Sequence, residues 1–210
     1  MSREDAAQPE FWEKRFRENF TPWDAGGVLA ALEQFLKTEP GGRRVLVPGC
    51  GSGYEVRAFA EAGHDVLAID FAAAAVERAR RILGPLSDRV SLADFFEFDF
   101  GAPFDLVYER AFLCSLPRLL RPRYVQRVLE LLGPRGKVAG FFFFEDGERG
   151  PPFGLRIGEL EALFGERFDR TADSPVSDSI PIFTGKERWQ VWSLKEIRSH
   201  PAQRPTPARG

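Results

Sequence analysis

The sequence contains few of the residues that bind metals or form disulfides. Two cysteines and two histidines occur among its 210 residues, and Cys50 and Cys114 form no CxxC pair. A zinc site needs a closely spaced set of four such ligands, and a disulfide framework needs several cysteine pairs. We therefore expect no metal site and no disulfide framework, as is typical of a protein from the reducing cytoplasm.

An excess of charge of one sign is missing as well, and so is a long apolar run. The chain has 29 Lys and Arg against 31 Asp and Glu, a formal net charge of −2. Proteins that coat nucleic acids are usually strongly basic, so we expect no nucleic-acid partner. The longest apolar run, 138–144, is far shorter than the roughly 20 residues of a membrane span, and residues 1–5 lack the apolar core of a signal peptide. We predict a cytoplasmic protein without a membrane partner.

Phenylalanine, in contrast, is abundant. The chain has 20 Phe, but only 3 Tyr and 1 Met. Because exposed aromatic patches promote association, so many Phe must be divided between a core and the walls of a site.

The two ends differ from the rest in composition. Residues 1–8 are small and polar, and residues 198–210 contain three prolines and no large apolar side chain. We predict a flexible N-terminus and a disordered tail around a single domain, 9–197.

Between the ends, short apolar runs alternate with helical patterns. This alternation predicts a parallel α/β sheet with helices on both faces. The predicted strands are 44–47, 65–70, 90–92, 104–108, 137–144 and 189–194, and the predicted helices are 54–62, 72–83, 123–132 and 155–164. In the last of these helices, Ile157, Leu160 and Phe164 share the face that should be buried. In such sheets the ligand lies outside the carboxyl ends of the strands, so the residues that follow each strand are the site candidates.

A glycine-rich loop follows the first predicted strand. Gly49, Gly51 and Gly53 alternate there, which lets the backbone turn tightly and approach a ligand before the next helix begins. Asp70 ends the second strand, where a carboxylate can accept hydrogen bonds from both ribose hydroxyls. Together these features predict a nucleoside-binding site.

The spacing of these residues distinguishes between two cofactors. The loop reads G-x-G-x-G, and a dinucleotide loop would read G-x-G-x-x-G. Asp94 follows the third strand and is placed to bind the amino group of an adenine, with Phe95 or Phe71 covering the ring; a plain turn residue is the alternative for Asp94. This pattern favours S-adenosylmethionine (SAM), which has no phosphate.

Several segments together resemble the thiopurine S-methyltransferase family of class I SAM-dependent methyltransferases. The resemblance covers about residues 11–194. It rests on Phe11-Trp12-Glu13-Lys14-Arg15-Phe16, Thr21-Pro22-Trp23-Asp24, Val47-Pro48-Gly49-Cys50-Gly51-Ser52-Gly53, Asp94-Phe95-Phe96, Tyr108-Glu109-Arg110-Ala111-Phe112-Leu113-Cys114, Gly150-Pro151-Pro152-Phe153 and Glu187-Arg188-Trp189-Gln190-Val191-Trp192. The glycine loop is specific only to the class, whereas its combination with the other segments is specific to the family.

The resemblance implies a fold and a set of site residues. The fold would be Rossmann-like, with a mostly parallel sheet of seven strands whose last strand is antiparallel, and residues 9–40 would cover the cofactor. By family position, Trp12, Phe16 and Trp23 would line the cofactor and substrate side. Gly49 would lie at the methionine part, Asp70 at the ribose and Asp94 with Phe95 at the adenine, although the animal thiopurine enzymes carry a different residue at position 94. Phe20 and Phe153 are further candidates for the acceptor side, and the family suggests a monomer.

The expected reaction transfers a methyl group from SAM to a small thiol, leaving S-adenosylhomocysteine. Arg110 is the candidate that faces the acceptor, because a fixed guanidinium favours a thiolate; an ion pair with Glu109 or another neighbour is the alternative. Asp24 is a candidate general base by position only, and a helix N-cap is at least as good an assignment. Cys50, between two glycines, is expected to be a small filler.

Other functions remain open from the sequence. Within the family, halide or thiocyanate and sulfide, selenium or tellurium species are alternative acceptors. A plant branch that methylates halide and thiocyanate lacks an arginine at the position of Arg110, which favours a thiol here. Outside the family, the sheet would also suit a nicotinamide oxidoreductase or a non-catalytic SAM-binding module.

Overall fold

A computed structural model describes residues 5–196 of the chain. The predicted tail, 198–210, and the first four residues lie outside the described part. Of the predicted flexible start, residues 5–8 are described, and Ala6 is buried there and accepts a hydrogen bond from Trp12 Nε1 at 2.8 Å.

Seven strands of the described chain form one sheet in the order β3-β2-β1-β4-β5-β7-β6. The strands are β1 (Arg44–Pro48), β2 (Asp65–Asp70), β3 (Val90–Leu92), β4 (Phe104–Arg110), β5 (Leu132–Phe143), β6 (Phe168–Pro175) and β7 (Glu187–Leu194). β1 to β5 pair in parallel, and β7 runs antiparallel to both β5 and β6. The predicted class, a mostly parallel α/β sheet with an antiparallel last strand, is confirmed.

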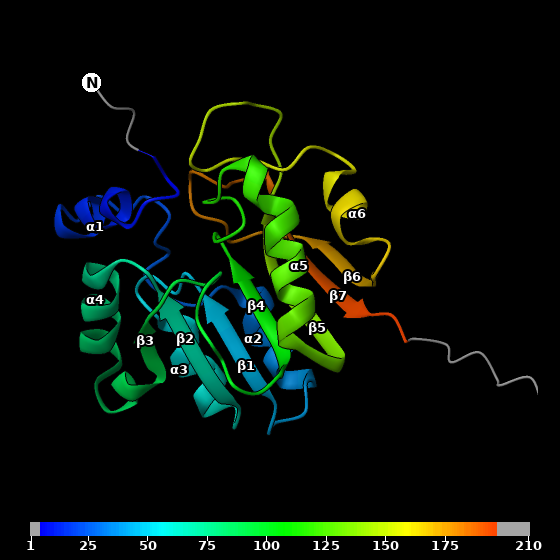
Figure 1. The fold of residues 1–210 in the computed structure, drawn as a ribbon, viewed down its shortest axis with the longest axis horizontal. Coiled ribbons are helices and arrows are strands. Elements are labelled where there is room, and N and C mark those ends of the chain that lie inside the picture. The colour runs from blue at the N-terminus through cyan, green and yellow to red at the C-terminus, as the bar shows by residue number, and fades with distance from the viewer. Residues whose placement is uncertain (1–4, 197–210) are drawn as a thin grey trace, which may run out of the picture.

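Helices cover both faces of this sheet. They are α1 (Pro9–Arg17), α2 (Ala30–Thr38), α3 (Tyr54–Glu61), α4 (Ala73–Leu83), α5 (Arg121–Leu131) and α6 (Glu159–Phe164). In Figure 1, α5 lies in front of the sheet, α2 and α3 lie behind it, and α1 lies beyond the arrowheads of β1 and β2. Since parallel strands end at one edge, α1 is thus close to the edge where the site was expected.

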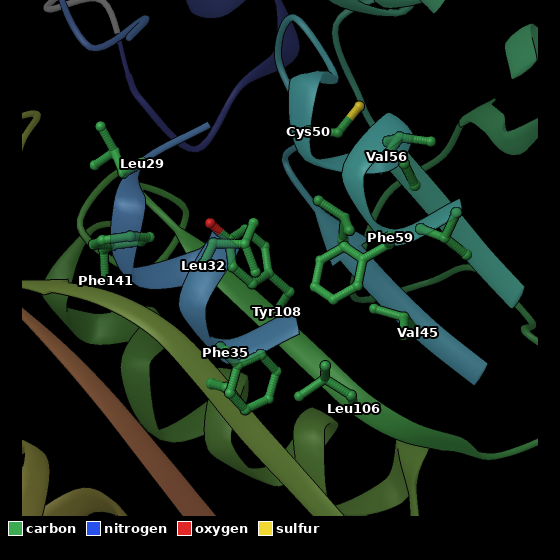
Figure 2. Packing of buried hydrophobic residues seen from close by; sticks show 14 of the residues in the cluster. Leu29, Leu32, Phe35, Val45, Cys50, Val56, Phe59, Leu106, Tyr108 and Phe141 are labelled. Carbon is green, nitrogen blue, oxygen red and sulfur yellow. The ribbon is translucent and has the colours of Figure 1, made fainter. Parts of the chain in front are cut away.

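Two apolar clusters fix the helices to the sheet. One face packs α2, α3 and α4 against β1 and β4, and Figure 2 shows Phe35 and Phe59 beside Leu106 and Tyr108 in this cluster. The other face packs α5 and α6, with Phe164 fully buried. Burying apolar surface on both faces explains why the strands are continuous apolar runs and do not alternate.

Most of the phenylalanines predicted for the core are buried, and Phe144 is only half-buried. Phe141, Phe142 and Phe143 are all at most 3% exposed, and Phe59 is fully buried. Cys50 is buried within the same cluster as Phe59, as expected of a small filler, and burial raises the pKa of its thiol well above the usual value. A thiol held neutral in this way is a poor nucleophile.

Two local predictions were wrong. The helix predicted over 155–164 begins only at Glu159, and Ile157, which was expected to be buried, is 92% exposed. The reason is that Leu155 pairs with Phe144 as an isolated bridge, so the chain is still extended there, and Gly158 adopts a left-handed conformation before the helix. β6 was not predicted, because only its first residue, Phe168, is buried and the rest of this edge strand is polar.

Candidate active site

A cavity of about 490 Å³ opens at the carboxyl ends of the central strands. Its walls come from the loops after β1, β2 and β4, from residues 93–96 after β3, and from the segment that contains α1. The volume lies within the range of small-molecule sites. The structure therefore brings the predicted site segments together.

The glycine loop after β1 forms one wall of the cavity. Gly49 and Gly51 have φ of +58° and +53°, which other residues rarely adopt. A Cβ on Gly49 would lie 2.4 Å from Cδ2 of Phe112, and a Cβ on Gly51 would lie 3.6 Å from Cζ of Phe16. The absence of a side chain at Gly49 lets the ring of Phe112 pack directly on the loop, and Phe16 lies opposite Gly51.

Gly53 has a different place from the other two glycines. It was predicted to contact the cofactor, but it does not belong to the residues that line the cavity. A Cβ on Gly53 would lie 3.1 Å from Cβ of Ala79 and 3.2 Å from Cδ1 of Leu83. This third glycine permits close packing of α3 against α4.

Asp70, at the end of β2, is buried and lines the cavity. Its carboxylate accepts the backbone N–H of Gly51 at 3.1 Å and that of Ala72 at 3.0 Å. Burial raises the pKa of Asp70 to about 6, and the two backbone donors act against this rise. The bonds hold the carboxylate beside the glycine loop, and further lone pairs remain for a ligand.

Aromatic side chains and Asp94 form the next part of the wall. Asp94, Phe71, Phe95 and Phe96 all line the cavity, as predicted for the first three. One oxygen of Asp94 accepts the N–H of Phe96 at 2.7 Å, so the alternative of a turn residue also holds, while the second oxygen is without a hydrogen bond from the described chain. Turn formation and ligand binding are compatible here.

The segment that contains α1 closes the cavity. Trp12 and Phe16 both pack edge-to-face on Trp23, with ring centroids 5.3 Å and 5.9 Å apart. Glu13 accepts the N–H of Ala74 at 2.8 Å and so fastens α1 to the start of α4. Because all three rings line the cavity, packing and site formation coincide in this segment.

Asp24 also fastens this segment. It accepts hydrogen bonds from the Ser52 hydroxyl in the glycine loop, from Arg78 of α4 at 3.1 Å and from the N–H of Gly26 at 2.8 Å. It is not a helix N-cap, because α2 begins only at Ala30. With three donors on one carboxylate, the arrangement favours a structural role for Asp24 over that of a general base.

Arg110, the last residue of β4, forms an ion pair with Glu187 of β7. The alternative of an ion pair with a neighbouring acid therefore holds, but the partner is Glu187 and not Glu109, and the pair is buried, since the two side chains are 10% and 2% exposed. The guanidinium carbon lies 5.0 Å from the ring centroid of Phe141 and 5.7 Å from that of Phe183. The second terminal nitrogen, Nη2, is buried and has no hydrogen-bond partner. A buried guanidinium N–H without a partner costs free energy. Arg110 itself is among the residues that line the cavity.

Glu187 holds this guanidinium in place. It also accepts a hydrogen bond from the Ser179 hydroxyl at 2.8 Å. Burial raises the pKa of Glu187, and the adjacent Arg110 opposes the rise. Arg110 and Glu187 are 77 residues apart and meet only because β4 and β7 flank β5 in the sheet, so the sequence pattern indicated no role for Glu187.

Glu109 was missed for a similar reason. Its carboxylate is buried and accepts the N–H groups of Phe112 and Leu113 and the hydroxyl of Tyr124. These bonds hold the turn that contains Ala111, which has a φ of +58°. Burial raises the pKa of Glu109 to about 7. The turn places Arg110 and Phe112 at the cavity.

Of the two phenylalanines predicted for the acceptor side, Phe20 lines the cavity and Phe153 does not. Phe20 lines the cavity although its side chain is 60% exposed, so it lies at the mouth. Phe153 does not line the cavity, but its N–H bonds to the carbonyl of Cys114 at 2.6 Å, and the preceding Pro151 and Pro152 do line it. A contact between Phe153 and the acceptor stays a prediction.

A comparison with protein families assigns the chain to a family. A sequence model of the family described as thiopurine S-methyltransferase (TPMT) matches residues 7–198. The chain belongs to this family. Its cofactor is S-adenosylmethionine, and the chain is a SAM-dependent methyltransferase, as the resemblance implied.

Individual relatives agree with the family assignment. A probable thiol methyltransferase 2 of Arabidopsis thaliana is 33% identical, over 72% of this chain and 70% of the relative. Thiocyanate methyltransferase 1 of the same plant is 30% identical, over 86% of this chain and 83% of the relative. A thiopurine S-methyltransferase of Aliivibrio salmonicida is 30% identical, over 89% and 98%.

Solved structures confirm the fold. The magnesium protoporphyrin IX methyltransferase of Synechocystis with bound SAM superposes with a TM-score of 0.71 at 14% identity, covering 93% of this chain and 100% of the other. A 1,6-didemethyltoxoflavin-N1-methyltransferase of Burkholderia thailandensis gives 0.69 at 20% identity, covering 90% and 87%. At these identities the likeness concerns the fold alone.

Among residues 5–196, the structure has neither a metal-binding cluster nor a membrane-spanning helix. Within 5–196, no group of three or more His, Cys, Asp or Glu side chains is arranged to hold a metal ion. Within the same range, no helix has the length and apolar character to cross a membrane. The monomeric state and the cytoplasmic location stay predictions.

Proposed function

We propose that this cavity binds SAM and presents its methyl group to a small thiol or a similarly soft nucleophile. The observation that carries the choice of acceptor is the Arg110 guanidinium at the cavity, which is held by Glu187 and flanked by the rings of Phe141 and Phe183. A cation fixed in this way favours an anionic nucleophile such as a thiolate.

The residues present suit the parts of SAM. Asp70 would accept hydrogen bonds from the ribose hydroxyls, and the free oxygen of Asp94 would accept one from the adenine amino group. Phe95 and Phe71 would cover the adenine ring. The methionine part would lie against the backbone of Gly49 and Gly51, both of which line the cavity.

The chemistry divides between the cofactor and the protein. When bound, SAM supplies a methyl group on a positively charged sulfur, which makes the carbon open to displacement. The side chains of this protein orient the acceptor and exclude water, and correct orientation alone can lower a barrier by several kcal/mol. Arg110 holds the acceptor as an anion, and the rings of Trp12, Phe16 and Trp23 attract a soft cation by about 0.5–2 kcal/mol.

No side chain of the site needs to remove the acceptor proton. A free thiol has a pKa of about 8.5, so a small percentage is thiolate at neutral pH without a general base. The guanidinium of Arg110 would increase this fraction when the acceptor is bound. This is consistent with the structural role of Asp24 described above.

Methylation of a small inorganic anion is the second candidate function. Arg110 would attract sulfide or a selenium or tellurium anion for the same electrostatic reason, whereas halide and thiocyanate would be accepted without a need for this arginine. The relative that is named thiocyanate methyltransferase supports this candidate. The extent of the apolar wall favours an organic thiol, since a bare anion gains nothing from contact with aromatic rings.

A methyl-transfer screen separates the two candidates. We expect methyl-labelled SAM to label heteroaromatic or aliphatic thiols with a kcat/KM at least tenfold above that for chloride, iodide or thiocyanate. Sulfide and selenide form a third group of acceptors in the same assay. Activity on halides alone would overturn the proposed use of Arg110.

The raised pKa of Asp70 predicts a pH-dependent cofactor affinity. Below pH of about 6 the carboxyl group of the free protein becomes protonated and loses acceptor capacity. We expect the Kd for S-adenosylhomocysteine to rise by up to about tenfold between pH 6 and pH 5, measured by calorimetry. In Asp70→Asn the affinity should be weaker at pH 7 and nearly constant over this interval.

The stability of the free protein should respond in the opposite sense. Because the folded pKa of about 6 lies above the ordinary value of 3.8, ionisation of Asp70 costs folding free energy. The contribution of Asp70 to stability therefore falls as the pH rises from about 4 to 6. The difference in free energy of unfolding between parent and Asp70→Asn reports this contribution, and a pH-independent difference would contradict the assignment.

A further inference from the structure

Four carboxylates line the cavity among the described residues: Asp24, Glu55, Asp70 and Asp94. Three of them are engaged by other parts of the chain, as described above. Glu55 is the exception, because no other described residue donates a hydrogen bond to its carboxylate or forms an ion pair with it, and only its own backbone N–H reaches it. Sequence analysis assigned this residue no role.

Glu55 lies next to the glycine loop of the site. It is the second residue of α3, directly after the glycine loop, and it is half-buried. Burial raises the pKa of Glu55, nearby Arg110 lowers it, and Asp24 raises it. A carboxylate that is partly removed from water and has a second acid nearby is stabilised by a cationic ligand.

We propose that Glu55 accepts a hydrogen bond from the ammonium group at the amino-acid end of the cofactor. This inference rests on the proposed placement of the methionine part against Gly49 and Gly51. Of the two cationic groups of SAM, the sulfonium has no N–H to donate, whereas the ammonium has three donors and belongs to the part nearest the loop. Glu55 is thus a cofactor-binding residue.

Two other roles for Glu55 predict different behaviour. As a general base for the acceptor, Glu55 would affect kcat without changing the affinity for S-adenosylhomocysteine. As an acid in the first turn of α3, it would stabilise the helix through the helix dipole, and its loss would lower thermal stability alone. Neither role depends on whether the bound ligand has an amino group.

The test combines a protein variant with ligand analogues. S-(5′-adenosyl)-4-thiobutyrate is S-adenosylhomocysteine without its amino group, and S-adenosyl-3-thiopropylamine lacks only the carboxylate. We expect the parent to bind S-adenosylhomocysteine roughly 10- to 100-fold more tightly than the thiobutyrate in calorimetry. In Glu55→Gln this preference should nearly disappear, because affinity falls for the two ligands with an amino group and stays constant for the thiobutyrate.

Glu61→Gln is the matched control, since Glu61 is an exposed residue at the end of the same helix and does not line the cavity. It should bind all three ligands as the parent does. An undiminished preference in Glu55→Gln would overturn the proposal. If that variant does not fold, equal affinity of the parent for S-adenosylhomocysteine and the thiobutyrate overturns it instead. Failure of the parent to bind S-adenosylhomocysteine at all would refute the cofactor placement itself, a separate result.

Discussion

Arg110→Met is expected to lower kcat/KM for the acceptor by about 100-fold. The substitution keeps the length and apolar contacts of the side chain but removes the charge that holds the acceptor as an anion, and a hydrogen bond to a charged group contributes about 1.5–3 kcal/mol. The pH–rate profile should shift to higher pH by about one unit, because the bound thiol would regain its ordinary pKa. Steady-state kinetics with the best thiol from the screen measures both effects.

The ion pair with Glu187 supplies the control for this variant. Removal of Arg110 leaves a buried carboxylate without its partner, which costs about 3–5 kcal/mol of stability. Arg110→Met with Glu187→Gln removes both charges and should recover much of that stability without recovering activity. Denaturant unfolding of both variants therefore separates the loss of fold from the loss of acceptor binding. An unchanged acceptor KM and pH–rate profile in the single variant would refute the proposed role of Arg110.

Gly49→Ala should have the second large effect, a loss of roughly 10- to 100-fold in affinity for S-adenosylhomocysteine. The new Cβ would lie 2.4 Å from the ring of Phe112, so this ring must move. The ring packs edge-to-face on Phe95 with centroids 5.2 Å apart, and both rings line the cavity. Overpacking of this kind costs about 1–3 kcal/mol. Because the displaced rings line the cavity, we expect this cost to appear as a weaker affinity for S-adenosylhomocysteine.

Gly101→Ala is the matched control for Gly49→Ala. Gly101 has a φ of +71°, close to that of Gly49, but nothing lies within 4 Å of a Cβ built there. An alanine in this left-handed backbone conformation costs about 1–2 kcal/mol at either position. Only at position 49 does its Cβ also collide with a neighbouring side chain. Calorimetry should therefore find parent-like affinity in Gly101→Ala, and parent-like affinity in Gly49→Ala as well would mean that the Phe112 ring moves without disturbing the cofactor.

The elements that sequence analysis located correctly are those with a strong apolar signal. β1, β2 and α3 lie within one residue of their predicted bounds, because buried strands and amphipathic helices have distinct periods. β6 carries no such signal, since it lies at the edge of the sheet and only Phe168 is buried. The start of α6 was misplaced because the pattern of Ile157, Leu160 and Phe164 suits a helix, whereas pairing between Leu155 and Phe144 keeps the chain extended.

For the site as well, the residues with a local sequence signal were predicted and the others were not. Residues that act within one strand-to-loop connection, such as Gly49, Asp70 and Asp94, were located from local pattern alone, and all three line the cavity. Glu187 and Glu55 were missed. Glu187 reaches Arg110 only across the sheet, and Glu55 looks in the sequence like any acid in the first turn of a helix.

The sequence by itself determined the class of sheet, the edge at which the cavity opens and much of the division of the phenylalanines between core and cavity wall, because each depends on short-range pattern and burial. Only the tertiary structure decided which charges are satisfied. It shows that Asp24 is engaged by Ser52 and Arg78, that Arg110 is held by Glu187 with one nitrogen left over, and that Glu55 is unpaired. These facts depend on contacts between residues far apart in the chain, whose partners no local pattern specifies.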